Sequence, residues 1–184
     1  VEALFARIKA AHGRLDVVFN NAGANIDTKL AGDVTWDDWR RVLSVNLDGA
    51  FLVAAAAFRM MRDQEPQGGR IINNGSISAH APRPNSVAYT ATKHAVSGIT
   101  KTASLDGRKY GIAVGQIDIG NVASDMTLKM VGGVPQADGS IKPEPRMAMD
   151  SVVTTFMTMA RLPLASNILN VTVMASAMPF VGRG

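Results

Sequence analysis

The residues best suited to chemistry in this sequence are Tyr89 and Lys93, which lie four positions apart. In a helix, side chains at this spacing project from the same face, so the phenol and the ammonium group can approach each other. A free phenol has a pKa of about 10, and a neighbouring cation favours its ionised form. The pair is therefore suited to proton transfer, although a surface tyrosine beside a solvated lysine would show the same spacing.

Two further polar residues could join this pair. Ser76 lies thirteen positions before Tyr89, in a loop that follows an apolar segment, and parallel α/β sheets bind ligands at the carboxyl ends of their strands. Asn46 lies between Val45 and Leu47 in a helical pattern, where a buried amide must find hydrogen-bond partners. Ser76 could equally be a turn former, and Asn46 could make only a structural hydrogen bond.

The helices that must position these residues are indicated by apolar residues at helical spacing. Gly13 offers a left-handed C-cap to the first helix, and Thr35, followed by acidic residues, offers an N-cap to the second. The predicted helices are 1–12, 36–62, 87–110 and 150–161.

Short apolar runs between the helices predict strands that are covered on both faces, as in a parallel sheet. The predicted strands are 15–19, 70–74, 112–119 and 167–174. Alternating strands and helices favour a doubly wound α/β fold with right-handed crossovers. Residues 120–149, rich in Gly, Pro and Met, are expected to form a loop with some helix.

Composition excludes several other classes of protein. The 184 residues, 47% hydrophobic and 18% charged, suit one globular domain with a core. The sequence has no cysteine, which excludes disulfides and thiolate chemistry and agrees with a cytoplasmic location. The net charge of +4 comes from scattered residues without a basic run, so nucleic acid is not an expected partner.

No membrane or metal site is expected either. The longest apolar run, 50–58, has nine residues, whereas a membrane span needs about 20. His80 and His94 flank the predicted site, but no third ligand lies at a useful spacing, so both are interpreted as ordinary histidines.

Taken together, four features of the sequence resemble the short-chain dehydrogenase family. They are the run Asn20-Asn21-Ala22-Gly23, Asn46, Ser76, and Tyr89 with Lys93, in the order and approximate spacing of that family. The resemblance covers nearly the whole chain and implies a Rossmann-like, doubly wound parallel sheet.

The resemblance also implies a catalytic role for each of these residues. Tyr89 would be the general acid/base, activated by Lys93 and the oxidised nicotinamide. Lys93 would hold the nicotinamide ribose, Ser76 would orient the substrate oxygen, and Asn46 would hold a water molecule that continues a proton relay.

By the same resemblance the cofactor is NAD or NADP. The turn at 20–23 would pass the adenosine half, and Ile119-Gly120 occupies the place of the family's usual Pro-Gly. Besides Tyr89 and Lys93, the implied cofactor-binding residues are Asn20, Ala22, Gly23, Gly120, Val122 and Ser124.

The implied function is hydride transfer between NAD(P) and a secondary alcohol or ketone. The implied partners are a small-molecule alcohol or carbonyl substrate and further copies of the chain in a homodimer or homotetramer. The alternative is a non-catalytic module that binds a partner.

A dinucleotide fold begins with a strand, a Gly-rich turn and a helix that binds the pyrophosphate. No such segment occurs in this sequence. Residues 1–184 are therefore expected to be the C-terminal two thirds of one such domain, with a further strand beside 15–19.

Overall fold

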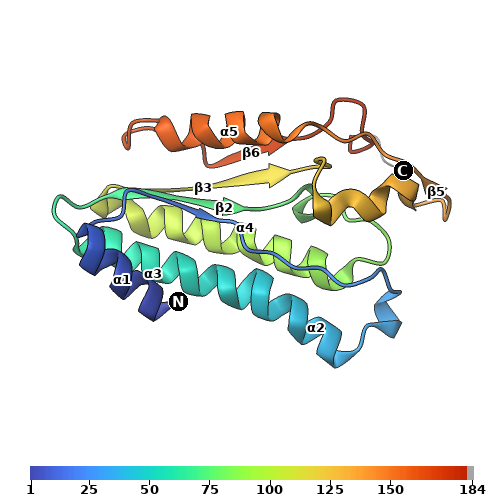
Figure 1. Ribbon diagram of the computed structural model, residues 1–184, viewed down its shortest axis with the longest axis horizontal. Coiled ribbons are helices and arrows are strands. Elements are labelled where there is room, and N and C mark those ends of the chain that lie inside the picture. Colours follow the sequence, from blue (N-terminus) through green and yellow to red (C-terminus); the bar gives the residue numbers. More distant parts are fainter. Residues whose placement is uncertain (182–184) are drawn as a thin grey trace.

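The computed structural model describes residues 1–181, without the side chains of residues 125, 126, 129 and 130. At its centre is a parallel sheet in the order β1-β2-β3-β6, covered by α5 on one face and by the other long helices on the opposite face (Figure 1). Its strands are β1 (Val17–Asn20), β2 (Gly69–Asn74), β3 (Ile112–Ile119) and β6 (Asn170–Val173). The helices are α1 (Glu2–His12), α2 (Trp36–Leu43), α3 (Ala50–Asp63), α4 (Val87–Gly107) and α5 (Met149–Arg161). This arrangement confirms the predicted parallel, doubly wound α/β fold.

Shorter elements lie in the connections. A two-stranded antiparallel ribbon, β4 (Val134–Pro135) with β5 (Ile141–Lys142), lies in the segment predicted as a loop. The short helical turns are η1 (Ala31–Asp33), η2 (Ser44–Gly49), η3 (Ile77–Ala79), η4 (Arg108–Tyr110) and η5 (Asp125–Gly132).

Two predicted helix boundaries are present as expected. Gly13 ends α1 with a φ of 74°, in the left-handed region that glycine adopts without strain. Thr35 begins α2, and its hydroxyl accepts a hydrogen bond of 3.1 Å from the Asp38 N–H.

The helix predicted over 36–62 is continuous from α2 to α3 but contains a π-helical turn, η2, that the sequence pattern did not reveal. Such turns occur frequently at functional sites, and η2 carries Asn46. By length and composition the helix Trp36–Asp63 is also apolar enough to cross a membrane, which the nine-residue apolar run did not suggest. In the structure its α3 part packs against β1 and β2, as the core helix of an α/β sheet does.

Two strands are shorter than predicted because, at their first predicted residues, hydrogen bonds with side chains take the place of the backbone hydrogen bonds between strands. The amide of Gln64 pairs with both the N–H and the carbonyl of Leu15, so β1 begins at Val17. Before β6, Asn167 donates to the Val114 carbonyl, and its side-chain oxygen accepts from the buried guanidinium of Arg70. The predicted strand 167–174 therefore begins at Asn170.

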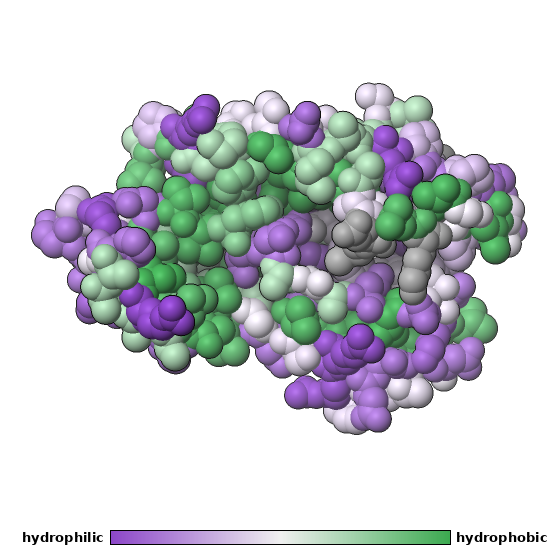
Figure 2. Space-filling view, viewed as in Figure 1, coloured by the Kyte–Doolittle hydropathy of each residue, from purple (hydrophilic) through white to green (hydrophobic). Residues whose placement is uncertain are grey.

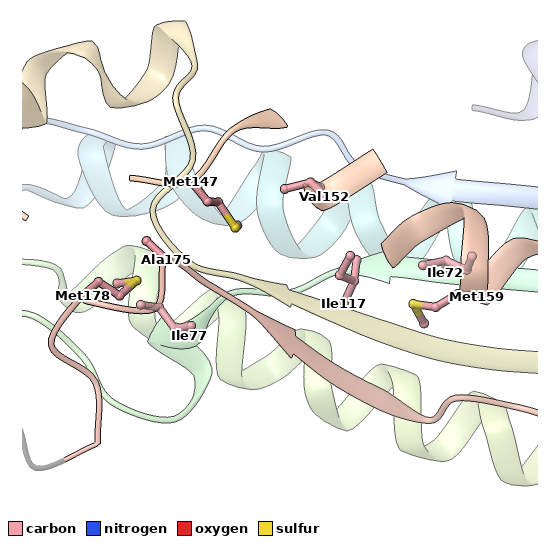
Figure 3. Close-up of a cluster of buried hydrophobic side chains, with 8 residues drawn as sticks. All are labelled: Ile72, Ile77, Ile117, Met147, Val152, Met159, Ala175 and Met178. Atoms are coloured by element: carbon pink, nitrogen blue, oxygen red, sulfur yellow. The ribbon is translucent and has the colours of Figure 1, made fainter. Parts of the chain in front are cut away.

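Apolar side chains fill the space on both faces of the sheet, because successive residues of a strand point to opposite faces. Toward α5, Ile72 and Ile117 lie in one cluster with Met159, Val152 and Met147 (Figure 3). Toward α3, the neighbouring Ile71 lies in a second cluster whose other buried members are Phe5, Ala56, Ala57, Met61, Ile112 and Val114. These two clusters hold the sheet between its helical layers.

A row of amides crosses the sheet at one level. The parallel register pairs Asn20 with Asn73, Asn73 with Gln116, and Gln116 with Asn170. Asn20 donates to the Asn73 side chain at 3.0 Å, and Asn73 and Gln116 both bind the Thr100 hydroxyl. Asn20 and Asn73 lie at the carboxyl ends of β1 and β2, whereas Asn170 is the first residue of β6. The Thr100 hydroxyl links the two central members of the row to α4.

Within the described residues β6 forms one edge of the sheet, and β1, which pairs only with β2, forms the other. Val17 is exposed there, and Figure 2 shows apolar surface gathered over this strand. An open strand edge with apolar surface is a site where another strand can pair.

Replacing Thr35 with alanine should lower the free energy of unfolding by about 1 kcal/mol, because the Asp38 N–H loses its acceptor. Urea denaturation followed by circular dichroism measures this loss. Thr35→Ser keeps the hydroxyl and should unfold like the wild type. An equal loss in both variants would show that the hydroxyl does not cap α2.

Candidate active site

Tyr89 and Lys93 lie in the first turns of α4, beside the carboxyl end of β2. The Lys93 ammonium group donates a hydrogen bond of 2.8 Å to the Asn74 carbonyl and lies 5.5 Å from the centre of the Tyr89 ring. Lys93 is only 4% exposed, so its charge is held inside the protein. The helical spacing thus brings the phenol and the ammonium group together, as predicted from the sequence.

Ser76 follows β2 and completes this group. It is buried, its hydroxyl accepts a hydrogen bond of 3.1 Å from the Ser78 N–H, and its side chain lies near enough to the Tyr89 phenol to lower the pKa of that phenol. Ser78, two residues further along the loop, offers a second hydroxyl and is also buried. Of these two serines, Ser76 is the one whose side chain acts on Tyr89.

Burial dominates the acid–base properties of both residues. It raises the pKa of Tyr89, while the hydrogen bond from Ser76 and the charge of Arg83 lower it and Asp118 raises it further. Burial also lowers the pKa of Lys93 from 10.5 to about 8, with partial compensation from Asp118. We expected Lys93 to depress the pKa of Tyr89, but the groups that lower it are Ser76 and Arg83, and desolvation of the phenol outweighs both.

Asn46 is buried in η2, and its amide is already engaged. Its oxygen accepts from the Ala24 N–H at 2.7 Å, and its nitrogen donates to the Ala24 carbonyl at 2.8 Å and to the Thr92 hydroxyl at 3.3 Å. Asn46 therefore ties the segment after β1 to α4. The water-relay role stays a prediction.

The residues of the predicted cofactor turn differ in their surroundings. Asn20 is buried and donates to the Ala50 carbonyl and to Asn73, so its side chain is committed to the fold. Ala22 is exposed at the carboxyl end of β1. A Cβ atom at Gly23 would meet Asn46 only at an ordinary 3.7 Å, so the fold itself does not require glycine there.

The segment after β3 places the remaining predicted residues. Gly120 donates to the Val173 carbonyl, and a Cβ atom on it would lie 2.6 Å from Met174, so glycine is needed there for packing against the end of β6. Val122 packs against the α5-side cluster, and the Ser124 N–H donates to the Thr127 hydroxyl. These contacts are within the fold and leave the cofactor roles of all three as predictions.

Other polar residues of the site were missed from the sequence. Asp118 accepts from the Ser76 N–H at 2.9 Å and from Gln116 at 2.7 Å, and it lies 2.7 Å from the His80 ring. The available signal was the alternation of Gln116 and Asp118 in an otherwise apolar strand, because buried polar groups need partners. His80 was interpreted as an ordinary histidine, although it faces this carboxylate.

Cavities and metal ligands do not point to another centre. A cavity of about 480 Å³ opens between α1 and α3 and is lined by none of the residues of this site. Within the described residues, no group of three or more His, Cys, Asp or Glu side chains is arranged to hold a metal ion.

Comparison with known proteins gives consistent matches. The sequence model of the short chain dehydrogenase family matches residues 1–132. An uncharacterised oxidoreductase of Escherichia coli is 44% identical over 114 residues, which cover 62% of this chain and 44% of that protein. The chain spans less than half the length of the curated relatives that it matches first.

Solved structures share the fold over most of the chain. An acetoin dehydrogenase of Enterobacter cloacae matches with a TM-score of 0.77 and 30% identity, covering 94% of this chain and 67% of that one. A gluconate 5-dehydrogenase of Burkholderia cenocepacia, solved with NADP and tartrate, matches with a TM-score of 0.79 and 27% identity, covering 94% and 68%.

The buried ammonium group predicts an unusual stability profile. Lys93→Met should raise the free energy of unfolding at pH 7 by about 2 kcal/mol. Each unit by which the pKa of Lys93 is lowered costs the wild type about 1.4 kcal/mol, which the variant regains. Loss of the hydrogen bond to the Asn74 carbonyl reduces this gain by about 1 kcal/mol. Between pH 8 and 10.5 the unfolded wild type binds more protons than the folded wild type, so its stability rises with pH. The advantage of the variant should therefore shrink over that interval.

Denaturation midpoints of both proteins from pH 7 to 10 measure this effect. Lys101→Met, on the exposed side of the same helix, is the matched control and should show no comparable gain. A constant difference between wild type and Lys93→Met across the pH range would contradict the assignment.

Proposed function

The chain belongs to the short-chain dehydrogenase family, and on that premise we propose that it transfers a hydride between NAD(P) and a secondary alcohol or ketone. The observation that carries the proposal is the group formed by Ser76, Tyr89 and Lys93 at the carboxyl end of β2. Open α/β sheets bind their ligands at this edge.

In the oxidation direction Tyr89 accepts the proton of the substrate hydroxyl, and in reduction it donates a proton to the carbonyl oxygen. Ser76, whose side chain lowers the pKa of Tyr89, orients the same substrate oxygen. Because burial raises the pKa of Tyr89, the phenol is held protonated and ready to donate. Removal of a proton from the alcohol needs additional positive charge beside the phenol.

A nicotinamide cofactor held at this site would supply the hydride-transfer chemistry to or from the carbinol carbon. The residues at the site fit the nicotinamide end of this cofactor. Lys93 provides a cation for ribose hydroxyls, and the side-chain oxygen of Asn74 is buried with no hydrogen-bond partner among the described residues, so it can accept from one. We propose Ala22, Gly23, Val122 and Ser124 as further contacts, together with Asn20 and Gly120 through their backbones.

The names of two solved relatives support a proposal for the substrate class. Acetoin carries a secondary alcohol next to a ketone, and gluconate 5-dehydrogenase is named for a hydroxy acid. We propose a small secondary alcohol or its ketone. We propose that Asn46 completes the proton relay by holding a water molecule, in addition to keeping Ala24 in place.

We also propose that the protein acts in the cytoplasm as a homodimer or homotetramer. The apolar run 50–58 has two faces: Ala54 and Ala57 are buried, whereas Phe51 and Leu52 are 55% and 47% exposed. Exposed apolar side chains on one helix face suit an interface between copies. A monomeric mass by light scattering at micromolar concentration would contradict this assembly.

The proposed reaction is tested by Tyr89→Phe, with nicotinamide absorbance followed on a panel of hydroxyketones, hydroxy acids and simple secondary alcohols. The protein should be the longest natural chain that carries this sequence. We expect turnover to fall at least a hundredfold while cofactor binding is retained, because one proton-transferring hydroxyl is removed.

Tyr110→Phe is the matched control, since Tyr110 is the other tyrosine of the sequence and packs edge-on against Phe58. It should turn over like the wild type. Equal turnover in both variants would exclude Tyr89 as the acid/base. Failure of the wild type to bind NAD(H) or NADP(H) would favour a non-catalytic binding module.

A further inference from the structure

Asp118 is a buried carboxylate that lies directly beneath the Ser76 loop. It is 0% exposed. One oxygen accepts from the Ser76 N–H and the Gln116 side chain, and the other accepts from Asn170 at 2.7 Å and pairs with His80. A buried carboxylate is tolerated when its lone pairs are satisfied in this way.

Gly75 makes this arrangement possible. A Cβ atom on Gly75 would lie 1.9 Å from the Asp118 carboxylate and 2.6 Å from the Gln116 amide. Neither side chain can move aside freely, because Gln116 is hydrogen-bonded to Ser97 and Thr100 of α4 and Asp118 is hydrogen-bonded to Asn170 of β6. Any side chain at position 75 would therefore occupy the same space as the carboxylate of Asp118.

The loop is also held from the α5 side of the sheet. Ile77 is buried in the same cluster as Ala175 and Met178, close to both (Figure 3). The hydrogen bond to the Ser76 N–H fixes the backbone before the Ser76 Cα atom, and the packing of Ile77 fixes the backbone after it. This leaves the hydroxyl of Ser76 with little freedom relative to Tyr89.

We infer that Asp118 is a positioning residue, which fixes the backbone of Ser76 through its N–H and requires glycine at position 75. The inference rests on the proposed function, because it assigns Asp118 a task in that same site. Asp118 acts through Ser76 and does not itself contact the reacting atoms.

The negative charge of Asp118 has a second effect on the site. It raises the pKa of Tyr89 and that of Lys93. The titratable groups around the carboxylate are His80 after η3 and Tyr89 and Lys93 on α4, whereas Gln116 and Asn170 are neutral. Removing the charge should therefore ease deprotonation of Tyr89.

Four variants separate these effects: Asp118→Ala, Asp118→Asn, Gly75→Ala and the double variant Gly75→Ala/Asp118→Ala. Gly98→Ala on α4 is the matched control, because a Cβ atom there meets nothing within 4 Å. Each variant is measured for hydrogen exchange at the Ser76 amide and for kcat and KM as functions of pH.

In Asp118→Ala we expect Ser76 to exchange at least tenfold faster and kcat to fall at least tenfold, with KM for the cofactor within about twofold of the wild type. Gly75→Ala should do the same by displacing the carboxylate. The double variant should lose less than another twofold, because both changes remove one interaction. Gly98→Ala should behave like the wild type.

Asp118→Asn keeps an acceptor for the Ser76 N–H and remains informative if the alanine variant does not fold. It should retain slow exchange at Ser76, and its rise of kcat with pH in the oxidation direction should move to lower pH. The inference would be overturned if the pH profile of Asp118→Asn matched that of the wild type and the kcat losses of the two single variants multiplied in the double variant. If the wild type shows no turnover, the proposed function fails, and unchanged Ser76 exchange in Asp118→Ala would separately refute the positioning role.

Discussion

The parallel register of the sheet, which sets Asn20, Asn73, Gln116 and Asn170 side by side, is the constraint on which the rest of the structure depends. A slip of one residue would turn these amides toward the apolar cluster under α5, where they would find no partners. On the correct face, the Thr100 hydroxyl binds Asn73 and Gln116, the Ala50 carbonyl accepts from Asn20, and Asp118 accepts from Asn170. The register in turn decides where β2 ends and therefore where Ser76 emerges.

The layers of the fold and the principal group of the site could be predicted from sequence, because each depends on a short-range repeat. Helical spacing was enough to pair Tyr89 with Lys93, and apolar runs were enough to find the four main strands. The strand ends at 15 and 167 were not predictable, because Gln64 and Arg70 determine them from distant positions.

The same limit applies to the surroundings of the site. Asn46 could be recognised as a buried amide, but its commitment to Ala24 depends on how the segment after β1 returns to η2. The direction of the Tyr89 pKa shift was missed for a related reason. Sequence shows which charges are near a phenol along a helix, whereas desolvation depends on everything that packs around it.

The shared space at positions 75 and 118 also constrains the order in which this sequence could have evolved. A Cβ atom at 75 would lie 1.9 Å from the Asp118 carboxylate, so aspartate could take up this position only in a chain that already had glycine at 75. Once the carboxylate was in place and bonded to Ser76, Gln116 and Asn170, regaining a side chain at 75 became harmful. The two positions therefore depend on each other, and homologous chains should carry aspartate at 118 only where 75 is glycine.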